Sequence, residues 1–145
     1  MAVGLLYAQA IEGLWQREID IDHIFKVMLT TSAHVPDQDL HDFKDDLTNE
    51  VSGTGYTAGG VTLANPTLTY TSATNKWKFD ADDVVWVDAT ITARHAHIYD
   101  DDAVLDVQKR LLALQDFESD LSSSGADFTI AWDADGIVEF AVATS

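Results

Sequence analysis

The stretch at residues 84–99, VVWVDATITARHAHIY, decides the fold class. It contains two runs rich in β-branched and aromatic residues, at 84–87 and 91–99, with a short polar break between them. Such runs are typical of β-strands, because branched and aromatic side chains pack well on a pleated surface. No segment with helical periodicity separates the two runs, so the sequence predicts two strands close together in the chain.

Further strand signals flank this stretch at close intervals. They lie at residues 24–32, 61–63, 67–71, 77–79, 110–117, 128–132 and 137–142. The segments between the later ones, ANP, SATN, DADD, YDDDA, SDLSSSGA and DADG, have the composition of turns. The last predicts a hairpin between 128–132 and 137–142, with Asp135 and Gly136 in its turn. Short, regularly spaced strands predict a mainly β fold, an antiparallel β-sandwich or barrel.

The N-terminal part of the chain differs from this pattern. A short amphipathic helix is predicted at residues 4–17, where apolar side chains recur near helical spacing. Residues 33–50, AHVPDQDLHDFKDDLTNE, are polar and contain Pro36, so we interpret them as a long loop with one helical turn around 40–47. We see no internal repeat and no linker, and therefore expect residues 1–145 to form a single β-rich domain.

Charge and composition exclude several function classes. The chain has 8 Lys and Arg against 25 Asp and Glu, a formal charge of −17. Such a surface repels nucleic acid and anionic membranes, and we expect neither as a partner. The absence of cysteine excludes disulfides, zinc–thiolate sites and a thiol nucleophile. No apolar run approaches the roughly 20 residues of a membrane span, and the N-terminus lacks the basic region of a signal peptide, so we expect synthesis in the cytoplasm.

Residues 51–63, VSGTGYTAGGVTL, raise the question of a phosphate-binding loop. The spacing fits neither the Walker pattern, since no Lys follows, nor the dinucleotide fingerprint, since a strand rather than a helix follows. We therefore expect a turn-and-bulge segment, with glycines at positive φ or in close backbone contacts and with Tyr56 as a packing anchor.

Three other groups of side chains are candidate binding sites. Asp100, Asp101 and Asp102 are the best candidates for calcium, but no acidic cluster has the spacing of an EF-hand. His95 and His97 share one face of a strand, and a third metal ligand would have to be His23, His34, His41 or a carboxylate. Solvated turns and half-exposed histidines explain both patterns, so we expect no metal and no cofactor.

Three tryptophans lie in or beside predicted strands: Trp77, Trp86 and Trp132. On a shared flat face they would form a sugar-binding platform, although packing inside the fold is the commoner role of such residues. The sequence shows no assembled nucleophile, base or metal set, and neither GxSxG nor SxxK occurs. We therefore expect a protein that is not an enzyme.

The chain resembles a family of small structural proteins encoded by tailed bacteriophages and prophages. The likeness spans about residues 5–141 and is most specific in NEVSGTGYTAGG, FDADDVVW and ITARHAHIY. The family pattern has an aromatic or aliphatic pair where His95 and His97 stand, which implies that these histidines are local variation. The tract DDDAVLDVQKRLLALQDF looks like a variable connection leading into a strand.

The resemblance implies a virion component, namely a capsid decoration or cement protein on the outside of an assembled icosahedral shell. Its expected partner is then the major capsid protein, and self-association is expected, with a trimer favoured. A head–tail connector, a tail component or a head fibre of the same virion is the alternative, and a sugar-binding surface module is a further one.

The contact surface expected for this role comprises two segments. The N-terminal segment and the loop at residues 35–47 carry apolar side chains that would order on docking. The candidate contact residues are Leu5, Leu6, Ile11, Leu14, Trp15, Val35, Pro36, Leu40, Phe43 and Leu47.

Overall fold

Strands make up 47% of the computed structural model, which describes residues 2–143, and helices make up 8%. The elements in chain order are β1 (Leu5–Leu6), α1 (Ala10–Trp15), β2 (Phe25–Thr30), η1 (Lys44–Asp46), β3 (Val61–Thr62), β4 (Thr67–Thr71), β5 (Lys76–Asp80), β6 (Val84–Asp100), η2 (Asp106–Gln108), β7 (Leu111–Ile130) and β8 (Val138–Ala141). The prediction of a mainly β fold is confirmed.

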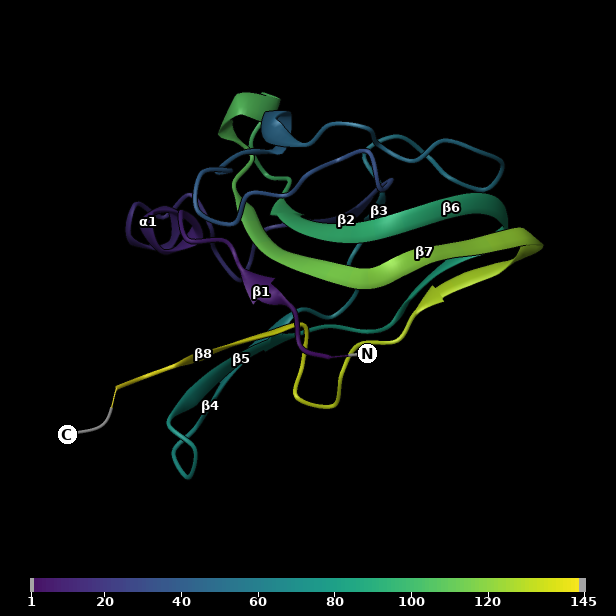
Figure 1. Cartoon of the computed structure of the whole chain (residues 1–145). Coiled ribbons are helices and arrows are strands. Elements are labelled where there is room, and N and C mark those ends of the chain that lie inside the picture. The colour runs from purple at the N-terminus through teal and green to yellow at the C-terminus, as the bar shows by residue number, and fades with distance from the viewer. Residues whose placement is uncertain (1, 144–145) are drawn as a thin grey trace.

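Two antiparallel sheets form the architecture (Figure 1). The large sheet has the strand order β1-β7-β6-β2-β3, and the small sheet has the order β4-β5-β8. Phe25 of β2 contacts Phe79 of β5 with ring centroids 5.1 Å apart, which joins the two sheets in one core. This arrangement is consistent with a β-sandwich.

The centre of the large sheet is a long hairpin of β6 and β7. The sequence predicts two short strands in the place of each, but both strands are continuous. The residues that predicted breaks are absorbed as bulges: Asp88, Glu118 and Gly125 have positive φ, and the β6–β7 register shifts around them. The predicted turn SDLSSSGA therefore lies inside β7, where pairing with β6 overrides its turn composition.

The predicted hairpin between residues 128–132 and 137–142 is wrong. The turn itself forms, with the Gly136 N–H donating to the Asp133 carbonyl at 2.8 Å. The chain nevertheless leaves the large sheet at this turn, because β8 pairs with β5 in the small sheet, for example through Val138 and Phe79. A favoured turn dipeptide fixes the local bend but does not select the partner strand.

The predicted N-terminal helix is shorter than expected, since α1 contains only Ala10–Trp15. Leu5 and Leu6 form strand β1, paired with Leu114 and Ala113 of β7. A short helix has little stability of its own, so a neighbouring strand that offers backbone hydrogen bonds determines the conformation of residues 5 and 6. No helix among residues 2–143 is long and apolar enough to cross a membrane.

The glycine-rich segment between β2 and β3 has the predicted role. All four glycines have positive φ, and a Cβ on Gly60 would lie 1.7 Å from the Val27 carbonyl oxygen. The Tyr56 ring stacks on Trp86, and its hydroxyl accepts from the Leu29 N–H at 3.0 Å and donates to Glu50 at 2.8 Å. The segment thus fixes the backbone beside β2.

Candidate functional site

Arg110, the residue before β7, connects several segments at one end of the large sheet. Its side chain is buried, and its Nε atom forms an ion pair with Glu18. Glu12 of α1 lies 3.7 Å from the same guanidinium, and Asp42 lies 4.0 Å away. The guanidinium carbon also sits 4.4 Å from the centre of the Phe43 ring. One cation therefore positions α1, residue 18, the approach to η1 and the start of β7.

A second contact joins η1 to η2 at the same end. Lys44 of η1 forms an ion pair with Asp106 of η2 at 2.7 Å. Figure 1 shows α1, η1 and η2 at the same end of the large sheet. Further hydrogen bonds attach the start of α1 to the β2–β3 loop, from the Ala8 N–H to Gln38 O at 3.0 Å and from Gln9 to Asp39 O at 3.1 Å. We call α1, residues 37–43 and residues 102–109 the end face.

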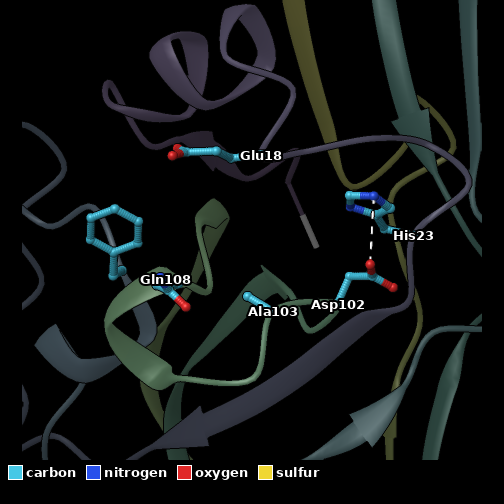
Figure 2. Close-up of a pocket in the computed structure, with 6 residues that line it drawn as sticks. Glu18, His23, Asp102, Ala103 and Gln108 are labelled. Carbon is cyan, nitrogen blue, oxygen red and sulfur yellow. Dashed lines mark ion pairs between the residues drawn. The ribbon is translucent and has the colours of Figure 1, made fainter.

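A pocket of about 320 Å³ opens between these segments. Figure 2 shows the polar ends of Glu18, Asp102 and Gln108 around it, together with the His23 imidazole. The Phe43 ring and Ala103 complete the wall. The pocket offers carboxylates, an imidazole and an aromatic ring, but none of its lining residues is a serine, threonine or lysine that would act as a nucleophile.

A histidine–aspartate pair forms one wall of the pocket. His23 Nδ1 lies 2.7 Å from Asp100 Oδ2, and its Nε2 lies 3.7 Å from Asp102. Asp100 is almost completely buried and also accepts the Asp102 N–H at 3.0 Å. Partial desolvation lowers the pKa of His23, but the hydrogen bond and charge of Asp100 outweigh it and raise the pKa above its ordinary value. Burial raises the pKa of the Asp100 carboxyl.

The three aspartates considered for calcium have different protein partners. Asp100 and Asp102 contact His23, whereas Asp101 forms ion pairs with Lys26 at 3.0 Å and with Lys109 at 2.7 Å. These contacts with the two lysines lower the pKa of Asp101 against the opposing effect of desolvation. Within residues 2–143, no group of three or more His, Asp or Glu side chains is arranged to hold a metal ion.

Large apolar side chains on the end face are exposed to solvent. Trp15 is 84% exposed and Val104 is 89% exposed. The full set on the end face is Ile11, Trp15, Leu40, Val104, Leu105 and Val107. Acidic side chains are exposed on and next to the same segments: Glu12, Asp39 and Asp102 on the end face, and Asp45 in η1. The end face is thus apolar with an acidic border.

The structure divides the predicted contact residues into three groups. Exposed members are Leu5, Ile11, Trp15, Val35 and Leu40. Half-buried members are Leu6, Leu14, Pro36 and Phe43. Leu47 belongs to the core, so it is not available as a contact of the folded chain, and its inclusion is corrected.

Sequence reasoning missed Val104, Leu105 and Val107. They lie in the tract interpreted only as a variable connection, and they are exposed beside the pocket. The sequence did contain an indication of these residues. Large aliphatic side chains in an acidic surface loop have no core to pack against, so they indicate a contact surface.

The tryptophans do not share one face. Trp86 is buried against Tyr56 and Phe128, with ring centroids 6.1 Å and 5.9 Å away. Trp77 packs on Tyr70 in the small sheet, and Trp132 donates its Nε1–H to the Asp82 carbonyl at 3.0 Å. A platform of all three is therefore not formed.

Four of the five histidines gather where the β2–β3 loop meets β6, two from the loop and two from the strand. The His34 ring centroid lies 5.1 Å from His97, 5.5 Å from His41 and 6.2 Å from His95. The sequence correctly placed His95 and His97 on one face, while the loop supplies the other two rings. Both nitrogens of His97 are occupied, by Tyr7 at 2.7 Å and by Thr30 at 2.9 Å, which leaves none for a metal.

Comparison with known proteins adds no relative: no family model matches the chain, and neither a curated protein nor a solved structure is significantly similar to it.

Proposed function

We propose that the chain is a virion structural protein of a tailed bacteriophage, and that it decorates the outside of the capsid. The resemblance of its sequence to phage structural proteins supports this class of protein. We assign the contact surface to the end face, because large apolar side chains are exposed there within an acidic border. Exposed apolar side chains in such a setting are typical of a protein interface.

The partner that fits this face is the major capsid protein, through an apolar patch with basic residues around it. Seven of the eight basic residues in the chain already form ion pairs with its own carboxylates: Lys26, Lys44, Lys76, Lys78, Arg94, Lys109 and Arg110. The remaining negative charge favours a cationic partner surface and opposes contact with the packaged genome. We assign the chain no catalytic activity and no cofactor.

Many copies acting together would give such a protein its effect. Each copy that spans neighbouring capsid subunits opposes their separation. Multivalent attachment of many copies then stabilises the assembled shell. Self-association into a trimer fits a position at a local three-fold axis of the shell. A connector, tail or head-fibre position in the same virion is the alternative, and it requires a copy number that matches a single ring or fibre rather than the whole shell.

Binding of purified chain to capsids that lack it tests the end face. Trp15→Ala and Val104→Ser remove exposed apolar surface without touching the core, and the double variant is expected to bind at least about tenfold more weakly. Val87→Ser is the matched control, because Val87 is also highly exposed but lies in β6 outside the end face. Equal loss in the control, or full binding by the double variant, would contradict the assignment of this surface.

Copy number separates the capsid from the alternative locations. Quantitative mass spectrometry of purified particles is expected to give copies in proportion to the major capsid protein. A copy number equal to that of a portal or tail ring would contradict capsid decoration and favour a connector or tail component instead.

A further inference from the structure

Buried imidazole rings pack the start of the β2–β3 loop against β6, with His34 lying against His95 and His97. His34 and His41 lie in the β2–β3 loop, whereas His95 and His97 lie in β6. His34, His95 and His97 are all buried. Nothing in the proposed capsid role uses these four side chains.

Two backbone N–H groups of the loop donate to ring nitrogens of the cluster. The Thr48 N–H donates to His34 Nδ1 at 3.3 Å, and the Asp37 N–H donates to His41 Nδ1 at 3.3 Å. An imidazole nitrogen accepts a hydrogen bond only when it carries no proton. Protonation of His34 Nδ1 therefore removes the acceptor of the Thr48 N–H, and the Thr48 hydroxyl at 3.0 Å is left as the group that accepts from the ring.

Among residues 2–143, no carboxylate forms an ion pair that would stabilise a positive charge on His34. Its Nε2 is buried without a hydrogen-bond partner among residues 2–143, and three other imidazoles surround the ring. Burial, together with the nearby His41 and His95, lowers the pKa of His34 to about 4. Burial likewise lowers the pKa of His97 far below its ordinary value.

Other charged groups face the cluster from each neighbouring element. From β7, Asp116 lies 3.9 Å from His95 Nε2, but Arg94 already binds this carboxylate at 2.9 Å. Burial lowers the pKa of His95, Asp116 and Asp120 oppose this effect, and Arg94 adds to it. From η1, Asp46 faces His41, and the N-terminal segment contributes the neutral hydroxyl of Tyr7.

We propose that His34, His41, His95 and His97 form a proton-operated latch, which holds residues 31–36 of the β2–β3 loop on β6 and releases them when His34 is protonated. The rest of the loop stays attached, because the Ala8 N–H donates to the Gln38 carbonyl at 3.0 Å, Gln9 donates to the Asp39 carbonyl at 3.1 Å, and Leu47 is in the core. Opening is thus local, and it changes the position of Val35.

Hydrogen exchange of the isolated chain at pH 7.5 and pH 5.0 tests the latch. In the open loop His34 regains its ordinary pKa of about 6.5. Protonation of His34 alone therefore raises the equilibrium constant for loop opening about 25-fold between pH 7.5 and pH 5.0. After correction for intrinsic exchange, the Thr48 amide, which donates to His34 Nδ1, is expected to lose protection by this factor. The Ile98 amide in β6 is expected to keep its protection.

Variants supply the controls. His34→Gln keeps a polar side chain that does not titrate, and its loop amides are expected to show at most a small part of the pH effect. His23→Gln is the matched control, because His23 lies outside the cluster, and it is expected to retain the full effect. Because the unmodified chain is measured first, a failure of His34→Gln to fold leaves the test intact.

Three results would overturn the latch: unchanged loop protection between the two pH values, simultaneous loss of loop and β6 protection, or an unaltered pH effect in His34→Gln. The readouts need no capsid, so they are independent of the proposed function.

Discussion

At the scale of single residues, two glycines with positive φ differ in what surrounds them. Gly60 has φ 82°, and an added Cβ would overlap the backbone of β2 at Val27. Gly125 has φ 57°, and nothing lies within 4 Å of an added Cβ. The first glycine is required by both conformation and space, while the second is required by conformation alone.

We predict that Gly60→Ala lowers the free energy of unfolding by at least about 3 kcal/mol, since strain and a backbone clash add together. Gly125→Ala is expected to cost only about 1 kcal/mol. Urea denaturation of both variants measures the difference. Equal losses would show that β2 does not restrict the glycine-rich segment.

Arg110 is the residue on which the end face depends. We predict that Arg110→Met lowers the free energy of unfolding by roughly 1–2 kcal/mol, because it leaves the partly exposed Glu18, Glu12 and Asp42 close together without their cation. The same variant is expected to weaken capsid binding. Denaturation and binding measurements on one preparation check both effects, with Arg94→Met as the control for loss of a more exposed arginine pair.

At the scale of elements, composition predicted the strands better than their ends and partners. The apolar and β-branched runs of β2, β4 and β5 were located within about two residues. The long hairpin of β6 and β7 was divided into short strands, because Asp88 and the serine-rich segment before Gly125 have turn composition. Residues of turn composition occur both at a bulge within a strand and at the end of a strand, so a single sequence does not distinguish the two cases. Pairing with a neighbouring strand decides which one forms.

The candidate site was predictable only in part, for a similar reason. Period-two alternation placed His95 and His97 on one face. The positions of His34 and His41 depend on how a long loop folds back, which local patterns do not encode. The end face likewise combines segments far apart in the chain, and Arg110 brings them together in three dimensions.

At the scale of the whole molecule, the histidines give stability a pH dependence of predictable sign. His34, His95 and His97 have lowered pKa values in the folded chain, so the unfolded chain binds more protons below about pH 6.5. Their effect makes the protein less stable as pH falls toward 4. His23 has a raised pKa and acts in the opposite direction, stabilising the fold as pH falls through the same range.

We predict that the urea midpoint decreases between pH 7.5 and pH 5.0. The destabilising effect of the lowered pKa values of His34, His95 and His97 is expected to exceed the stabilising effect of the raised pKa of His23. His34→Gln is expected to flatten this dependence, and His23→Gln is expected to steepen it. Equal slopes in both variants, measured by fluorescence at several pH values, would contradict the opposite signs assigned to the two histidines.

The central claim is that the end face of this acidic β protein binds the outside of an assembled capsid. Hydrogen-exchange footprinting of the chain, free and bound to capsids, tests it most directly. We predict new protection in residues 11–15, 37–43 and 102–109, with little change in the hairpin residues 85–92 and 118–127. Protection confined to that hairpin, or no protection at any capsid concentration, would contradict the claim.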